Sequence, residues 1–218
     1  MPALTIVGVD LSGPTNVNDT AVVWFAGDAT GMTCVDFLAG ASDAALASVV
    51  GGLVAGGSTV AVGLDAPLSY NAGGGDRPGD RALRSLAQQH GLPSGSVMTP
   101  TTTRMAYLTL RGHAVARHLM AIGVPAASIA EVHPSAALVL HGAAARDVIA
   151  LKTRLRSRLR LLRWMRGQGL RGIPSYLALT SHLTAACAAA LAAWRWALGK
   201  PAWCMLAAPP AHPFDFAC

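Results

Sequence analysis

The sequence predicts an α/β fold in a single domain, residues 1–218. The chain is 52% hydrophobic over 218 residues, which is enough to build one large core. Short runs rich in Val, Ile, Phe and Trp precede and follow a helix-like segment, in the order β-β-β-α-β. No charge run and no Ser/Pro-rich linker divides the chain into two parts.

The first three strands are expected to form a meander, because turn-forming Gly, Asn, Asp and Thr residues separate them. A helix follows, with Ser42 as its N-cap, and then a fourth strand. These five elements are expected over Thr5 to Asp10, Thr20 to Ala26, Met32 to Leu38, Ser42 to Ala55 and Ser58 to Asp65.

The rest of the chain is mostly helical, with two further strands. A glycine-rich segment, Asn71 to Gly79, lacks the Gly-Lys-Ser/Thr of a P-loop and is interpreted as a mobile loop. Beyond Pro134 the pattern is helical up to Leu198. In this part we expect helices over Asp80 to His90, Met105 to Ile122 and Tyr176 to Leu198, and strands over Ala127 to His133 and Ala202 to Leu206.

One apolar segment, Tyr176 to Trp194, is long enough to span a bilayer. Alanine dominates it and inserts weakly, so we expect a buried core helix and no membrane span. The four cysteines are scattered, which argues against zinc and a disulfide framework and favours the reducing cytoplasm. The N-terminus shows no basic segment followed by an apolar one, so no signal peptide is expected.

Three of the eleven acidic residues share one setting, since each lies in or at the end of a strand-like apolar run. They are Asp10, Asp65 and Glu131, the only glutamate in the chain. One such residue alone would be interpreted as a turn or a helix cap. Three together would repel one another unless cations lay between them, so the set predicts Mg²⁺ or Mn²⁺. Two such ions would activate a water and stabilise the leaving oxygen in phosphodiester cleavage.

Four short motifs in this order and spacing resemble domain-of-unknown-function family 429, the predicted RNase H-like nucleases related in fold to RuvC-type Holliday junction resolvases. The motifs are Gly8-Val9-Asp10-Leu11-Ser12-Gly13, Gly63-Leu64-Asp65-Ala66-Pro67, Arg77-Pro78-Gly79-Asp80-Arg81 and Glu131-Val132-His133-Pro134-Ser135. The resemblance extends to Ser181-His182. It implies an RNase H-like fold with a central mixed five-stranded sheet flanked by helices, and an acidic metal site across neighbouring strands. The nuclease activity of that family is an inference from fold.

The chain departs from that family in its last helix. The family pattern resembles His-x-x-Asp-Ala, whereas this chain has Ala185 where the acid is expected. His182 lies one helical turn earlier and is a candidate fourth ligand through a neutral ring nitrogen, better suited to Mn²⁺ than to Mg²⁺. A core histidine is the alternative. The catalytic and metal-binding set is therefore predicted as Asp10, Asp65, Glu131 and His182.

His133 is predicted either to assist Glu131, two residues earlier on the same strand face, or to lie in a turn before Pro134. Two arginines near the glycine-rich loop, Arg81 and Arg104, are candidates to hold a phosphate. An ion pair between Asp80 and Arg84 on the helix surface is the alternative use of that region.

The densest charge lies between residues 152 and 171, where eight basic residues occur with no acid among them. A helical wheel places one set of basic residues on one face, namely Lys152, Arg156, Arg160, Arg163 and Arg166, and four leucines on another, namely Leu151, Leu155, Leu159 and Leu162. This face is predicted to contact the phosphate backbone of DNA or RNA, with an ordinary solvated surface as the alternative.

The sequence thus favours a metal-dependent nuclease or phosphodiesterase. The loss of the acid at Ala185 favours an alternative, a catalytically impaired nucleic-acid-binding protein on the same fold. A third interpretation starts from the Asp10-Leu11-Ser12-Gly13 segment, which resembles the first phosphate loop of actin-like sugar kinases. Those enzymes clamp ATP between two such domains, and this chain supplies one.

Overall fold

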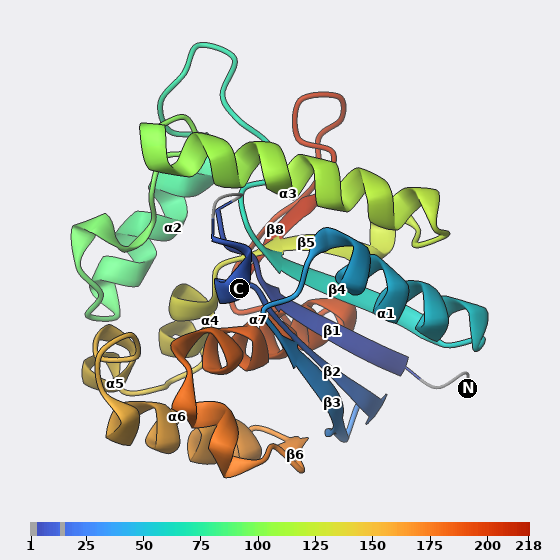
Figure 1. The fold of residues 1–218 in the computed structure, drawn as a ribbon. Helices are drawn as coiled ribbons and strands as arrows, with labels where there is room; N and C mark the ends of the chain where they lie inside the picture. Colours follow the sequence, from blue (N-terminus) through green and yellow to red (C-terminus); the bar gives the residue numbers. More distant parts are fainter. Residues whose placement is uncertain (1–3, 14–15) are drawn as a thin grey trace.

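The computed structural model describes residues 4–13 and 16–218, and within these it shows an eight-stranded sheet in the order β6-β3-β2-β1-β4-β5-β8-β7 (Figure 1). The first three residues, on which the expectation about a signal peptide partly rests, lie outside the described residues. The strands are β1 Leu4–Asp10, β2 Ala21–Asp28, β3 Gly31–Ala39, β4 Thr59–Asp65, β5 Ile129–Val132, β6 Leu170–Arg171, β7 Cys204–Met205 and β8 Asp215–Ala217.

The sheet is mixed, as expected, but it has eight strands and not five. Strands β1 and β4 are parallel and central, β2 is antiparallel to both its neighbours, and β5 pairs in parallel with β4. The predicted order β-β-β-α-β is therefore confirmed, with β6, β8 and β7 added at the two ends of the sheet. Strand β7 lies within the predicted strand Ala202 to Leu206, whereas β6 and β8 were not predicted and, with two and three residues, are too short for a hydrophobic pattern.

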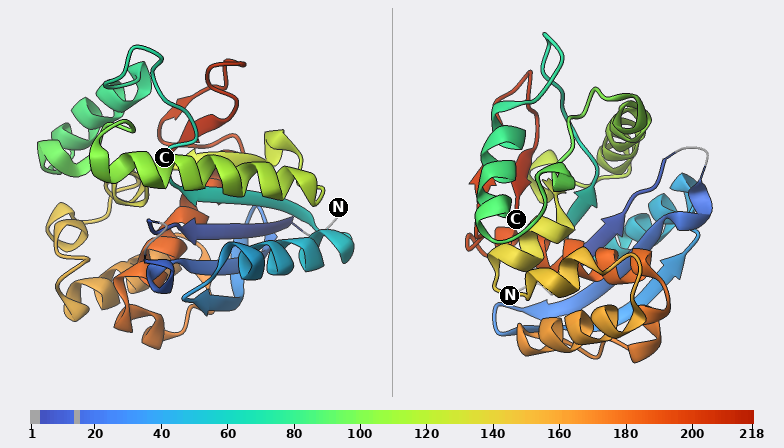
Figure 2. Two further views of the ribbon diagram at one scale, coloured as in Figure 1. Left: turned by 45° about the horizontal axis from the view of Figure 1, so that its top comes forward. Right: turned by 90° about the vertical axis from the view of Figure 1, so that its left-hand side faces the viewer.

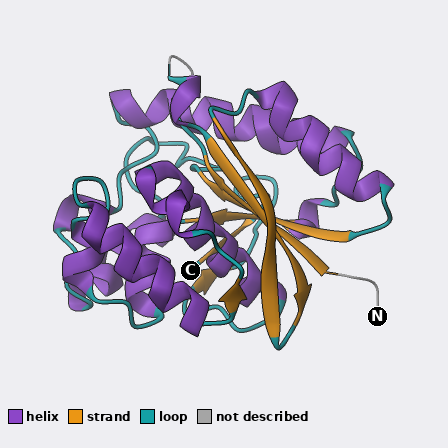
Figure 3. Ribbon diagram, turned by 60° about the horizontal axis from the view of Figure 1, so that its bottom comes forward, coloured by secondary structure: helices purple, strands orange, loops and turns teal. Residues whose placement is uncertain are grey.

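Helices cover both faces of the sheet (Figure 3). Helices α1 and α3 lie next to each other on one face, while α7 packs on β1 and β4 from the other face and contacts α4 and α6 (Figure 2). The α-helices are α1 Asp43–Ala55, α2 Pro78–Gln89, α3 Thr103–Ala121, α4 Pro134–Leu140, α5 Ala145–Ile149, α6 Leu155–Gly167 and α7 Ser181–Ala197; the 3₁₀ helices are η1 Val17–Asp19, η2 Ser94–Ser96, η3 Ala126–Ser128 and η4 Ser175–Leu179.

Two glycines allow α7 to lie directly against the backbone of the sheet. A Cβ added at Gly8 would lie 2.1 Å from the carbonyl oxygen of Ala186, and one at Gly63 would lie 2.8 Å from that of Ala189. These separations leave no room for a side chain, so glycine is required at both positions. The alanine-rich sequence of α7 follows from the same close approach, because larger residues would hold the helix away from the sheet.

The predicted core helix is confirmed. The segment predicted as one helix over Tyr176 to Leu198 is divided into η4 and α7, and α7 is buried along most of its length. No helix among residues 4–13 and 16–218 is long and apolar enough to cross a membrane. The N-cap predicted at Ser42 is also confirmed, since its side chain accepts a hydrogen bond from the backbone N–H of Ala45.

Candidate functional site

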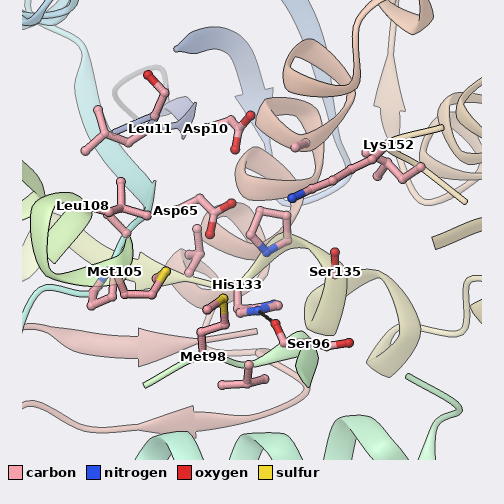
Figure 4. Close-up of a pocket in the computed structure, with 18 of the residues that line it drawn as sticks. Asp10, Leu11, Asp65, Ser96, Met98, Met105, Leu108, His133, Ser135 and Lys152 are labelled. Carbon is pink, nitrogen blue, oxygen red and sulfur yellow. Dashed lines mark hydrogen bonds between the residues drawn. The ribbon is translucent and has the colours of Figure 1, made fainter. Parts of the chain in front are cut away.

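The site begins with two aspartates at the same level of neighbouring strands. The parallel register of β1 and β4 pairs Asp10 with Asp65, each the last residue of its strand. Each lies two residues after the glycine that receives α7, so both carboxyl groups leave the sheet on the α7 face. Figure 4 shows the two carboxyl groups facing one cavity. Asp10 and Asp65, predicted together from sequence, are brought together in the structure.

The two carboxyl groups interact unfavourably when both are charged. Burial raises the pKa of Asp65 well above its usual value, and the charge of Asp10 and a hydrogen bond shared with that residue raise it further. The positive charge of Lys152 acts in the opposite direction. A bound proton or a bound cation would each relieve the repulsion between the two aspartates.

His182 joins this pair from the first turn of α7. Its Nδ1 donates a hydrogen bond to Asp10 Oδ2 at 2.7 Å, and its Nε2 lies 3.7 Å from Asp19 Oδ1. The hydrogen bond to Asp10 raises the pKa of His182 above its usual value. His182 is therefore a partly exposed residue at the site, which excludes the alternative of a core histidine.

Lys152 completes the polar end of the cavity. It was predicted as one of the backbone-binding residues of the basic helix, but it lies before α6 and lines the cavity. Figure 4 shows its amine pointing toward the space next to Asp10 and Asp65. Its charge acts on Asp65 and on His182, which is consistent with this placement.

Glu131 does not join the two aspartates, although it borders the same cavity. Its Oε2 accepts hydrogen bonds from Arg77 Nη1 at 2.7 Å and from the backbone N–H of Leu68 at 2.7 Å. Its Oε1 accepts from Arg77 Nη2 at 2.5 Å. Both oxygens are thus occupied by a buried arginine, and the prediction of Glu131 as a third ligand of this cluster is not matched by the geometry.

The reason is the register of β5. Glu131 is paired with Leu64 and not with Asp65, so its side chain leaves the sheet on the opposite face from the two aspartates. Val132 occupies the face of the aspartates, since its Cγ1 would lie 3.2 Å from a Cβ added at Gly63. A difference of one residue along β5 therefore decides which side chain faces the site.

His133 is the N-cap of α4 and not a partner of Glu131. Its Nδ1 accepts a hydrogen bond from the N–H of Ala136, and its Nε2 donates one to the carbonyl oxygen of Ser96. Burial lowers the pKa of His133, which keeps the ring neutral. Of the two predictions for this residue, the turn before Pro134 is the one that the structure matches.

Arg77 forms ion pairs that differ from the ones expected. It binds both Glu131 and Asp80, and it is 1% exposed. The alternative ion pair between Asp80 and Arg84 is wrong, because Arg84 pairs with Asp76. Hydrogen bonds to Arg84 and Thr99 hold the pKa of Asp76 well below its usual range.

The two arginines predicted to hold a phosphate, Arg81 and Arg104, are exposed and do not line the cavity. Arg81 donates to the carbonyl oxygen of Asp76. An arginine that the sequence analysis missed, Arg111 of α3, lies closer to the site. It donates to the carbonyl oxygen of Ser12 at 2.7 Å and pairs with Asp43, which fixes the chain just after Asp10. The sequence signal was a basic residue at a buried position of an amphipathic helix.

The basic helix matches the predicted one in part, since Leu151 and Leu162 are buried as expected. Its buried residues are Ser157, Leu161, Leu162 and Met165, whereas Leu155 and Leu159 are exposed. Arg160, expected on the phosphate-binding face, forms an ion pair with Asp147. Arg166 donates to the carbonyl oxygen of Ile173 at 2.5 Å. Arg156 and Arg163 are exposed and do not line the cavity.

The cavity has a volume of about 570 Å³ and lies where the chain leaves β1, β4 and β5. Its polar end holds Asp10, Asp65, His182 and Lys152. Within the described part of the chain, no three His, Cys, Asp or Glu side chains are arranged to hold a metal ion. The two aspartates fit one Mg²⁺ or Mn²⁺, because such ions are held by one or two carboxylates together with water and substrate oxygens.

The fold and site define an α/β protein whose polar cavity is built on paired aspartates at the ends of two central parallel strands. The family described as "Protein of unknown function (DUF429)" matches residues 8–211, and the chain belongs to this family. No curated protein matches the chain. No solved structure matches it either.

Proposed function

We propose that this protein is a metal-dependent phosphodiesterase of the nuclease type, acting in the cytoplasm. The observation that carries the proposal is the pairing of Asp10 with Asp65 on the face where His182 and Lys152 also lie. Two carboxylates can hold a divalent cation, a histidine can transfer a proton and a lysine can bind a phosphate oxygen, and these functions support hydrolysis of a phosphodiester. The four described cysteines are free thiols, which is compatible with the cytoplasm.

Asp10 and Asp65 would hold one divalent cation, Mg²⁺ or Mn²⁺. When bound, this ion supplies Lewis acidity and lowers the pKa of water, so that a nucleophile forms at neutral pH. Burial, and after it the charge of Asp10, raises the pKa of Asp65, and a cation between the two carboxyl groups would offset both effects. The two-ion set expected from the sequence would need a third carboxylate, and Glu131 is bound to Arg77.

The remaining side chains have separate roles in the proposed reaction. Water releases one proton to the solvent as its oxygen forms a bond to phosphorus, the bond from phosphorus to the leaving oxygen breaks, and the leaving oxygen takes up the proton that His182 carries. Lys152 binds a non-bridging oxygen of the phosphate through its ammonium group. His182, held in place by Asp10, carries the proton at Nε2, and its raised pKa keeps it charged nearer to neutral pH.

Replacement of Asp10 tests this function. The Asp10→Asn variant keeps the size and hydrogen-bonding shape of the side chain but removes a ligand charge, so we expect hydrolysis in Mn²⁺ to fall at least about a thousandfold. Asp36→Asn is the matched control, because Asp36 is an exposed aspartate on β3. Circular dichroism would verify that both variants are folded. Full activity of Asp10→Asn would exclude the proposal.

A second candidate is a binding protein that has lost turnover. It is favoured by two observations: Glu131 is bound in an ion pair by Arg77, and position 185 is an alanine where an acid was expected. This candidate predicts binding of DNA or RNA that weakens steeply with salt and no cleavage in either Mg²⁺ or Mn²⁺. A filter-binding titration over a salt series, run alongside a cleavage assay, separates the two candidates.

A further inference from the structure

The cavity next to the two aspartates has a large apolar side. It is lined by Pro93, which precedes η2, by Val97 and Met98, which follow η2, and by Met105 and Leu108 of α3. Figure 4 shows Met98, Met105 and Leu108 around the Asp65 side of the cavity. A phosphodiester group would leave this wall in contact with water, so the wall indicates that a substrate also carries an apolar group.

The shape of the apolar group is indicated by the two methionines. Methionine side chains are flexible, and their polarisable sulfur makes favourable contacts with aromatic rings. Met98 is 44% exposed, so part of its side chain is accessible to a ligand in the cavity. A planar aromatic ring is thus the group that this wall suits best.

The charge of the cavity limits the size of the substrate. Among the described residues that line it, the lysine and arginine side chains are Lys152 and Arg77. Arg77 is fully engaged by Glu131 and Asp80, so of these two side chains only Lys152 can add to the contacts that a bound cation makes with a phosphate. A polynucleotide backbone needs several such contacts for affinity, whereas one ammonium group matches the single charge of one phosphodiester.

The other basic residues that were predicted to contact a polynucleotide add no further positive charge to the lining of the cavity. Arg160 pairs with Asp147, and Arg81, Arg104, Arg156 and Arg163 lie outside the lining of the cavity. A volume of about 570 Å³ lies within the range of small-molecule sites, roughly 300–1,000 Å³.

We propose that the substrate is a small aromatic phosphodiester of mononucleotide size, with its ring against Met98, Met105 and Leu108 and its phosphate against Lys152. This inference rests on the proposed function and names its substrate class. The ring can be a nucleobase or another aryl group, since the wall recognises planarity and apolar area and not a pattern of hydrogen bonds.

The test compares substrates of different size under the same metal conditions. Bis(para-nitrophenyl) phosphate, a para-nitrophenyl ester of thymidine monophosphate, a short single-stranded oligonucleotide and a duplex are assayed with Mn²⁺. We expect kcat/KM for the better small diester to exceed that for either polymer by about tenfold or more. The two small diesters separate a general aryl preference from a nucleobase preference.

The same assay is run on cavity variants. Met98→Ala and Met105→Ala remove the ring contacts and should raise KM for the small diesters about tenfold, with kcat little changed. Tyr107→Ala and Leu110→Ala are the matched controls, since these residues of α3 are 62% and 68% exposed and lie outside the cavity lining. Calorimetry with a chelator present measures the affinity of the cavity for bis(para-nitrophenyl) phosphate when no metal supports turnover.

The outcomes separate the two proposals. One outcome is that a polymer is cleaved faster than the small diesters, at a rate that is unchanged in the methionine variants and abolished in Asp10→Asn. This result would overturn the substrate class but not the proposed function. No cleavage of any substrate would overturn the function. In that case the substrate class is decided by calorimetry: weaker binding in Met105→Ala supports it, and equal binding in Met105→Ala and the wild type overturns it.

Discussion

Arg77 and Glu131 form a two-pronged buried ion pair, with Nη1 to Oε2 at 2.7 Å and Nη2 to Oε1 at 2.5 Å. The pair lies on the face of the sheet opposite Asp10 and Asp65, because the register pairs Glu131 with Leu64. Glu131 therefore has a structural role in holding the chain after β4, where it also binds the N–H of Leu68.

Removal of the Glu131 charge is expected to lower the stability of the fold and to leave cation binding unchanged. Glu131→Gln leaves the buried Arg77 with Asp80 as its remaining acidic partner, so the free energy of unfolding should fall by about 3 kcal/mol. Urea unfolding measures this change. Thermal unfolding with and without Mn²⁺ is the control: the ion should stabilise Glu131→Gln as much as the wild type. A loss of that stabilisation would make Glu131 a ligand.

Lys152 is expected to bind substrate without supporting the fold. Its side chain is exposed at the cavity, so Lys152→Gln should raise KM about tenfold and leave the unfolding midpoint unchanged. The chain has one other lysine, Lys200, which is exposed and lies outside the cavity lining, and Lys200→Gln is the matched control. Equal KM values in the two variants would show that Lys152 does not bind the substrate.

An acid at position 185 should strengthen the cation site. Ala185 lines the cavity one helical turn after His182, so Ala185→Asp places a third carboxylate near Asp10 and Asp65. We expect Mn²⁺ to bind about tenfold more tightly by calorimetry and activity to rise. Ser181→Asp, at another cavity-lining position of α7, is the comparison. Unchanged Mn²⁺ affinity in Ala185→Asp would place the ion elsewhere.

The pH dependence of stability without metal reports on Asp65. Its folded-state pKa is raised above 3.8, so its contribution to stability is fully present in acid and is lost as the pH rises through that raised value. In Asp65→Asn, the side chain at position 65 is uncharged at every pH. In a chelator, the wild type should therefore lose stability relative to Asp65→Asn as the pH rises from about 4 toward neutrality. Urea unfolding over a pH series checks this, and a constant difference between the two proteins would contradict it.

The sequence was sufficient to place Asp10 and Asp65 together because each ends a long strand with the same Gly-x-Asp spacing. It was not sufficient for Glu131. Strand β5 has four residues, all buried, so no alternation of polar and apolar residues indicates which face a side chain takes.

Some positions of the basic helix were mispredicted for a different reason. A helical wheel contains no tertiary contacts, and the ion pair of Arg160 with Asp147 joins residues from different helices. The exposed positions of Leu155 and Leu159 likewise follow from how α6 docks, which periodicity alone does not fix. The short strands β6 and β8 were missed because two or three residues carry no pattern.

In the proposed site, Asp10 and Asp65 hold a divalent cation. A crystal soaked in Mn²⁺, with data collected to reveal anomalous scattering from manganese, tests it most directly. We expect one anomalous peak between the carboxyl groups of Asp10 and Asp65, absent in crystals of Asp65→Asn. A peak at Glu131, or no peak beside the two aspartates in the wild type, would contradict it.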